Sequence, residues 1–138
     1  IRRLIDGERV THKGRFFEMT DALCEPRPVQ PRLPILIGGS GKTKTLRTTA
    51  RYADVWNAYG SPERFQELGA VLEERCGEVG RDPATIEITS GRAIPDADGV
   101  KRLRDLGVAR FMVPPPAFDP DGITQGLDRL GKLIASVA

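Results

Sequence analysis

The residues best suited to chemistry lie in a glycine-rich run that joins an apolar segment to a helix-like segment. In that setting, backbone amides and the N-terminus of a helix bind phosphate groups. Glycine allows positive φ and close approach of the backbone, and neighbouring hydroxyl and ammonium groups add donors and charge. The predicted phosphate-binding residues are Gly38, Gly39, Ser40, Gly41 and Thr43, with Lys42 adding a positive charge.

This run also has two alternative interpretations. Gly41-Lys42-Thr43 matches the end of the G-x-x-x-x-G-K-[ST] motif of nucleotide triphosphatases, but Leu36 stands where the first glycine is required. Asp54 opens its apolar segment instead of ending it, so it does not supply the metal-binding acid of such enzymes. The remaining alternative is a strand-to-helix turn that needs glycine and binds nothing.

Asn57 is the second candidate for cofactor binding, because it is polar within the apolar segment 53–58 and falls where a strand would end. Its neighbour Trp56 is expected in the core. Arg92 follows another predicted strand, where it faces either an anionic substrate or solvent. His12, the single histidine, is expected on the surface and not as a catalytic base. No catalytic residue is predicted.

Cysteine usage gives no sign of a metal site. Cys24 and Cys76 are far apart and have no nearby histidine or cysteine at ligand spacing. Both are expected to be reduced thiols, with Cys76 on one helix stripe together with Phe65, Leu68 and Leu72.

The elements that must position these residues alternate between strand and helix after residue 32. Strands are predicted at 33–37, 53–58, 86–90 and 110–113, and helices at 42–52, from Ser61-Pro62 to Gly77 or Gly80, around 100–106, and from Asp119-Pro120 onward. The run 33–37 is continuously apolar, which predicts a strand buried on both faces. Before it, a short strand is predicted at 14–19 and an extended, proline-rich connector at 24–31.

Four β-then-α units imply parallel strands and an α/β fold. They form either a small doubly wound sheet or half of a (β/α)₈ TIM barrel, which needs about 250 residues. Residue 1 is Ile, so further sequence is expected before it, and the proline-rich start resembles an insertion in a larger barrel. The expected organisation is therefore an irregular insertion at 1–32 and four βα units at 33–138, the C-terminal half of a barrel.

Composition limits the partners. The 138 residues carry 21 basic and 19 acidic side chains, interspersed along the chain, for a net charge of +2. The sequence has no basic block that would favour nucleic-acid binding, and no apolar run approaches the roughly 20 residues that cross a bilayer. The expectation is a cytoplasmic protein that binds neither nucleic acid nor membrane.

Several segments, taken in order, resemble the second half of luciferase-like monooxygenases, most closely the members that use the deazaflavin coenzyme F-420 (F420). The segments are Gly14-Arg15-Phe16-Phe17, Pro26 to Pro31, Pro34 to Gly41, Thr45-Leu46-Arg47, Ala50 to Asn57, and Gly80-Arg81-Asp82-Pro83 with Ile86 to Thr89. Two positions depart from the family pattern: Lys42 stands where an acid is frequent, and Val55 where glycine is frequent.

The resemblance implies that the four units are the fifth to eighth of a (β/α)₈ barrel. It implies that the glycine run, together with Thr43, holds the coenzyme phosphate, and that the ring lies near Asn57. The implied activity is hydride transfer between a small organic substrate and C5 of the deazaflavin, with the N-terminal half of the same barrel as partner and self-association as a further expectation. Flavin mononucleotide (FMN) is the alternative coenzyme, in a monooxygenase, because it presents a ribityl phosphate to the same loop. A non-catalytic phosphate-binding module is the alternative from another class.

Overall fold

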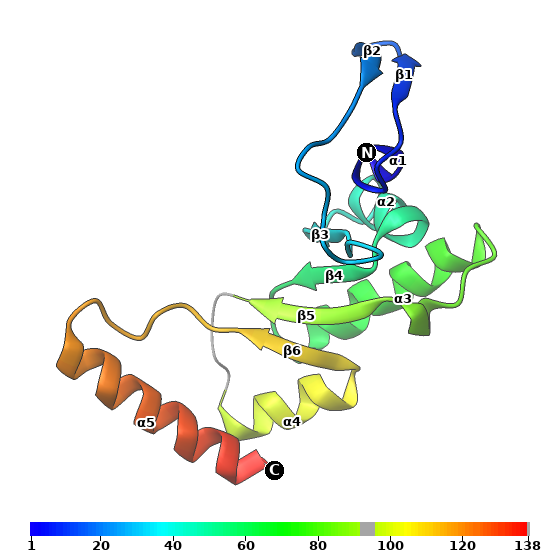
Figure 1. Cartoon of the computed structure of the whole chain (residues 1–138). Helices are drawn as coiled ribbons and strands as arrows, with labels where there is room; N and C mark the ends of the chain where they lie inside the picture. The colour runs from blue at the N-terminus through cyan, green and yellow to red at the C-terminus, as the bar shows by residue number, and fades with distance from the viewer. Residues whose placement is uncertain (92–95, 138) are drawn as a thin grey trace. The chain divides into compact units, whose positions relative to one another are not determined.

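The computed structural model describes residues 1–91 and 96–137. The chain divides into two compact units, Ile1–Pro34 and Ile35–Ala138 (Figure 1).

The first unit contains a short helix, α1 (Arg2–Ile5), and an antiparallel hairpin of β1 (Val10–Lys13) and β2 (Glu18–Ala22). The amide of Gly14 donates to the Phe17 carbonyl at 2.9 Å and closes the turn. The predicted strand at 14–19 is therefore wrong over 14–17, which form this turn. Both strands are largely exposed, so no alternation of buried and exposed residues marks them in the sequence.

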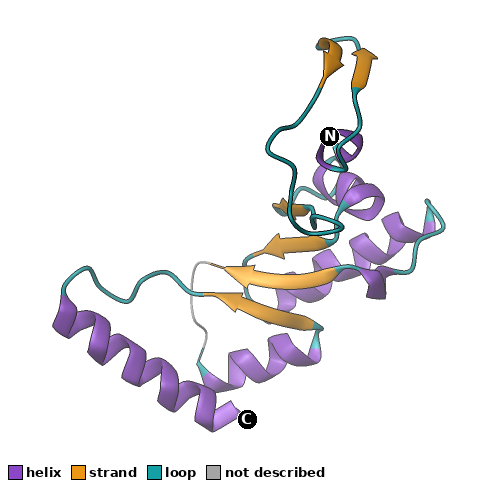
Figure 2. Ribbon diagram, viewed as in Figure 1, coloured by secondary structure: helices purple, strands orange, loops and turns teal. Residues whose placement is uncertain are grey.

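The second unit is an α/β fold, as predicted. Its sheet has the order β3 (Leu36–Gly38), β4 (Val55–Ala58), β5 (Glu87–Gly91) and β6 (Val108–Met112), and every neighbouring pair is parallel. The helices are α2 (Thr45–Tyr52), α3 (Pro62–Gly77), α4 (Ala97–Asp105) and α5 (Pro120–Val137), with a short 3₁₀ turn, η1, at Pro83–Thr85. Figure 2 shows the strand and helix segments in alternation.

The core of this unit forms between one face of the sheet and helices α2 to α4. Trp56 is fully buried, and its ring centroid lies 6.1 Å from that of Phe65 on α3. The stripe predicted for the second helix is confirmed, since all four of its members are buried. The stripe residues are Phe65, Leu68, Leu72 and Cys76. Packing of this stripe against Trp56 fixes α3 on the sheet.

One expectation about burial is wrong. Leu36 in β3 is 51% exposed, so this strand is not buried on both faces. Apolar composition alone cannot distinguish a covered face from an uncovered one, and β3 is also an edge strand with a neighbour only on the β4 side. The last helix, α5, begins where it was predicted, and its apolar side chains Leu127 and Ile134 are 57% and 64% exposed.

The start of α3 carries a strongly perturbed carboxyl group. Ser61 caps the helix by accepting from the Arg64 amide, and Pro62 occupies the first turn, as predicted. The Ser61 hydroxyl and the backbone amide of Glu63 donate to the Glu63 carboxylate, and Arg102 of α4 adds a further hydrogen bond. Together these lower the pKa of Glu63 to about 2. The carboxylate therefore links the start of α3 electrostatically to the last turn of α4.

We expect Glu63→Gln to change how stability depends on acidity. A carboxyl whose pKa is depressed in the folded state contributes stability above its unfolded pKa, and this contribution is lost as the pH falls from about 4.5 towards 2. The melting temperature of the parent should therefore fall more steeply over this interval than that of Glu63→Gln. Circular-dichroism melts between about pH 6 and pH 3 measure it. Glu73→Gln, an exposed change on the same helix, should follow the parent, and equal slopes for Glu63→Gln and the parent would contradict the assignment.

Candidate functional site

The glycine run leaves β3 and leads into α2, and its second residue is fixed on both sides by β4. Gly39 has a φ of +128°, a region that residues with a Cβ rarely adopt. Its amide donates to the Asn57 carbonyl at 2.9 Å, and its carbonyl accepts from the Trp56 indole nitrogen, also at 2.9 Å. The Gly39 amide is thus already used within the sheet, so any phosphate must be bound by the amides that follow it.

A threonine that the sequence interpretation did not select lies over this run. A Cβ placed on Gly39 would come within 3.2 Å of the Thr45 methyl carbon, and one on Gly41 within 2.8 Å of the Thr45 hydroxyl oxygen. Thr43, the predicted donor, is exposed. The available signal was spacing, because Thr45 is the first residue of α2 and lies four residues after Gly41.

The N-terminus of α2 differs from those of the later helices in lacking a side-chain cap. Ser61, Asp96 and Asp119 cap the starts of the three helices that follow. At α2 the cap position is Lys44, whose side chain makes no cap hydrogen bond. Within residues 1–91 and 96–137, the amides of Ser40 and Gly41 also have no hydrogen-bond acceptor. Unpaired donors at a helix start are what an anion satisfies.

Lys42 contributes less positive charge to the loop than the sequence suggested. Its ammonium group pairs with the Glu67 carboxylate on α3. The hydrogen bond from Lys42, followed by one from Arg64, lowers the pKa of Glu67. The positive charge of Lys42 is therefore partly neutralised by its own neighbour.

Asn57 lies on the face of the sheet that faces away from the core. Its chain neighbours Trp56 and Ala58 belong to the buried cluster, and successive side chains of a strand point to opposite faces. Gly38 is its cross-strand neighbour in β3, and a Cβ on Gly91 would lie 3.6 Å from its side-chain nitrogen. A Cβ on Gly38 would meet no atom of the described residues within 4 Å. Asn57 thus lies between two glycines. Gly38, Asn57 and Gly91 together form a surface, the floor of the candidate site, with open space above Gly38.

The Asn57 amide is tied to the next strand. Its nitrogen donates to the Thr89 hydroxyl at 2.9 Å and to the Thr89 carbonyl at 3.3 Å. Thr89 was not selected from the sequence, where it is one β-branched residue in an apolar strand. The structure therefore brings the glycine run, Asn57 and Thr89 together at the carboxyl ends of β3, β4 and β5.

The other residues considered from the sequence do not join this group. Arg92 lies outside the described residues. His12 is exposed in β1 of the first unit, where Cys24 is half-buried. Burial raises the pKa of Cys76, which has no exposed surface. In residues 1–91 and 96–137, no three His, Cys, Asp or Glu side chains are grouped closely enough to hold a metal ion.

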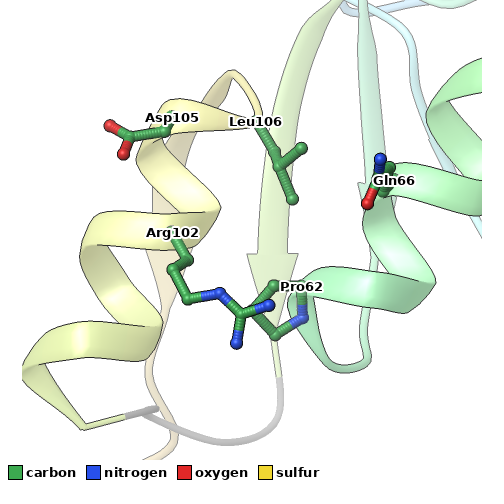
Figure 3. A pocket seen from close by; sticks show the side chains of 5 residues that line it. All are labelled: Pro62, Gln66, Arg102, Asp105 and Leu106. Atoms are coloured by element: carbon green, nitrogen blue, oxygen red, sulfur yellow. The ribbon is translucent and has the colours of Figure 1, made fainter.

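A shallow pocket of about 220 Å³ lies between α3 and α4 (Figure 3). Its walls are Pro62, Gln66, Arg102, Asp105 and Leu106. Arg102 is paired with Glu63, and both helices belong to the layer on the core side of the sheet. The pocket therefore shares no residue with the group around Asn57. No helix within the described part of the chain has the length and apolar character to cross a bilayer.

Comparison with known proteins gives a family match and several related sequences. The luciferase-like monooxygenase family matches residues 1–112. An uncharacterized protein of Mycobacterium tuberculosis is 27% identical over 135 residues, and an F420-dependent glucose-6-phosphate dehydrogenase of Microbacterium testaceum is 36% identical over 84 residues. These alignments cover 98% and 59% of this chain, and 48% and 24% of the relatives.

A solved F420-dependent secondary alcohol dehydrogenase, in complex with an F420-acetone adduct, has a similar fold. Its TM-score is 0.78 at 17% identity, over 99% of this chain and 58% of that one. The chain thus spans about half the length of the mycobacterial relative and little more than half of this structure.

The geometry of the loop predicts opposite responses at two adjacent glycines. Gly39→Ala should destabilise the protein by about 1–3 kcal/mol, because alanine is strained at this φ and its methyl group meets Thr45. Gly38→Ala, the matched control, places its methyl group in open space and should change stability by less than about 1 kcal/mol. Urea unfolding curves measure both. Equal destabilisation by the two changes would show that the strained position is not Gly39.

Proposed function

Because this chain belongs to the luciferase-like monooxygenase family, we propose that it is the C-terminal half of a (β/α)₈-barrel oxidoreductase that transfers a hydride between an organic substrate and F420. The observation that carries this proposal is the glycine run between β3 and the uncapped start of α2, next to the floor around Asn57. The F420-dependent relative at 36% identity supports the choice of coenzyme.

The phosphate of the coenzyme would be held by the loop that follows Gly39. The unpaired amides of Ser40 and Gly41 are its donors, with hydroxyl groups from Ser40 and Thr43. The N-terminal end of the α2 dipole favours the same negative charge. Gly38 and Gly39 have other roles: Gly39 forms the turn, and Gly38 leaves the approach open.

The ring would lie over the floor formed by Gly38, Asn57 and Gly91. These residues fit a flat group because Asn57 supplies a polar contact, the two glycines add no side chain of their own, and the space above Gly38 is open. When bound, the coenzyme supplies the hydride chemistry at C5. The residues of this chain orient the ring and cover one side of it against water.

The uncovered surfaces of the second unit support the half-barrel arrangement. Strands β3 and β6 end the sheet on either side, and α5 leaves apolar side chains exposed. Four further βα units would pair with both edges and cover the open face. On this proposal, residues 1–32 form an insertion and residues 33–138 form units five to eight.

Binding by the whole gene product tests the coenzyme assignment. Titration with F420, followed by its fluorescence, should show saturable binding, and titration with FMN should show weaker binding. Tighter binding of FMN would instead favour the monooxygenase, and binding of neither coenzyme would favour a non-catalytic module.

We expect Gly38→Val to weaken F420 binding at least about tenfold, equivalent to about 1.4 kcal/mol. The branched side chain fills the open space above β3, while the strand itself tolerates it. Gly69→Ala, on α3 with no atom near the added methyl group, is the control and should leave the dissociation constant unchanged. Unchanged affinity in Gly38→Val would exclude coenzyme binding over Gly38.

The half-barrel proposal predicts that residues 1–138, expressed alone, self-associate or unfold without cooperativity, because two sheet edges and the apolar face of α5 are uncovered. Analytical ultracentrifugation and thermal melting measure this. A stable, cooperative monomer would favour a self-contained module.

A further inference from the structure

We propose that Thr89 is a positioning residue that orients the Asn57 amide, so that the amide oxygen, and not its nitrogen, is presented to a hydrogen-bond donor of the ligand. This inference rests on the proposed function for the identity of the ligand. The orientation itself rests only on hydrogen bonds between β4 and β5.

The hydrogen-bond pattern at Thr89 leaves one orientation for Asn57. The Thr89 hydroxyl donates its single hydrogen to the Trp56 carbonyl, 3.3 Å away. Towards Asn57 it can therefore only accept, and the Thr89 carbonyl can only accept as well. Both groups thus require the Asn57 nitrogen, at 2.9 and 3.3 Å, and would repel its oxygen. Because Thr89 is 1% exposed, water does not readily replace its hydroxyl.

The amide oxygen of Asn57 is left without a partner among residues 1–91 and 96–137. Gly38 on one side and Gly91 on the other bring no competing donor side chain. A hydrogen-bond acceptor in this place selects an N–H or O–H group. The imide N–H of a flavin or deazaflavin ring and the hydroxyl group of an alcohol substrate both have this chemistry.

The test compares Thr89→Val, which keeps the shape and removes the hydroxyl, with Thr89→Ser, which keeps the hydroxyl. In the whole gene product, Thr89→Val should weaken F420 binding about three- to tenfold, as expected for one neutral hydrogen bond. Thr89→Ser should stay within about twofold of the parent. If the donor belongs to the substrate, F420 affinity should stay constant and the KM for substrate should rise by the same factor instead.

A double-mutant cycle with Asn57→Ala distinguishes a positioning role of Thr89 from a general loss of stability. In an Asn57→Ala background, Thr89→Val should cause no further loss of affinity, because the group it positions is gone. Additive losses, or equal losses in Thr89→Val and Thr89→Ser, would overturn the inference. So would Asn57→Ala with unchanged affinity for both coenzyme and substrate.

A readout without coenzyme keeps the two proposals distinguishable. In the apo protein, the Asn57 side-chain amide protons should exchange slowly with solvent by NMR, and Thr89→Val, unlike Thr89→Ser, should accelerate this exchange. If neither coenzyme binds but this pattern is found, the proposed function fails while the orientation of Asn57 stands. Fast exchange in the parent would overturn the orientation.

Discussion

The candidate site depends on the two hydrogen bonds that join Gly39 to β4. One uses the Gly39 amide and the Asn57 carbonyl, and the other uses the Gly39 carbonyl and the Trp56 indole. Trp56 is held in turn by the core, where it packs against Phe65. The packing of α3 therefore determines where the glycine run turns. The turn needs glycine, because a side chain with a Cβ is strained at the φ of Gly39.

The two faces of the sheet have different roles: one packs in the core, and the other carries the candidate site residue Asn57. Trp56 and Ala58 point into the apolar cluster, while Asn57 between them points to the opposite face. On that face the side chains pair with one another across strands. Asn57 bonds to Thr89, and the Arg110 guanidinium donates to one Glu87 carboxylate oxygen at 3.4 Å and forms an ion pair with the other at 3.1 Å. Polar groups that pair with each other leave few hydrogen-bonding atoms free to contact a ligand. The unpaired amide oxygen of Asn57 is therefore a strong candidate for such a contact.

Family motifs distant from the loop have structural explanations. In the Gly80-Arg81-Asp82-Pro83 segment, Asp82 accepts from the Ala84 amide at 2.9 Å and caps η1. Arg81 donates to the Ala50 carbonyl of α2 and to the Thr85 hydroxyl, at 3.2 and 3.0 Å. This segment precedes β5, at the end of the sheet opposite the glycine run. Its resemblance to the family thus reflects how α2 is attached to η1 and does not identify a binding residue.

The sequence by itself determined the order of strands and helices in the second unit, the stripe from Phe65 to Cys76 and the place of the glycine run, because each depends on periodicity or on residues with restricted backbones. It could not show that β3 is an edge strand with an exposed face, because that depends on which other segments cover it. It also could not show that 14–17 form a turn, because the exposed strands on either side carry no alternation of buried and exposed residues. Only the tertiary structure placed Thr45 over the loop and Thr89 against Asn57. The Asn57–Thr89 contact joins residues 32 positions apart, and strand register, which no local pattern encodes, decided it.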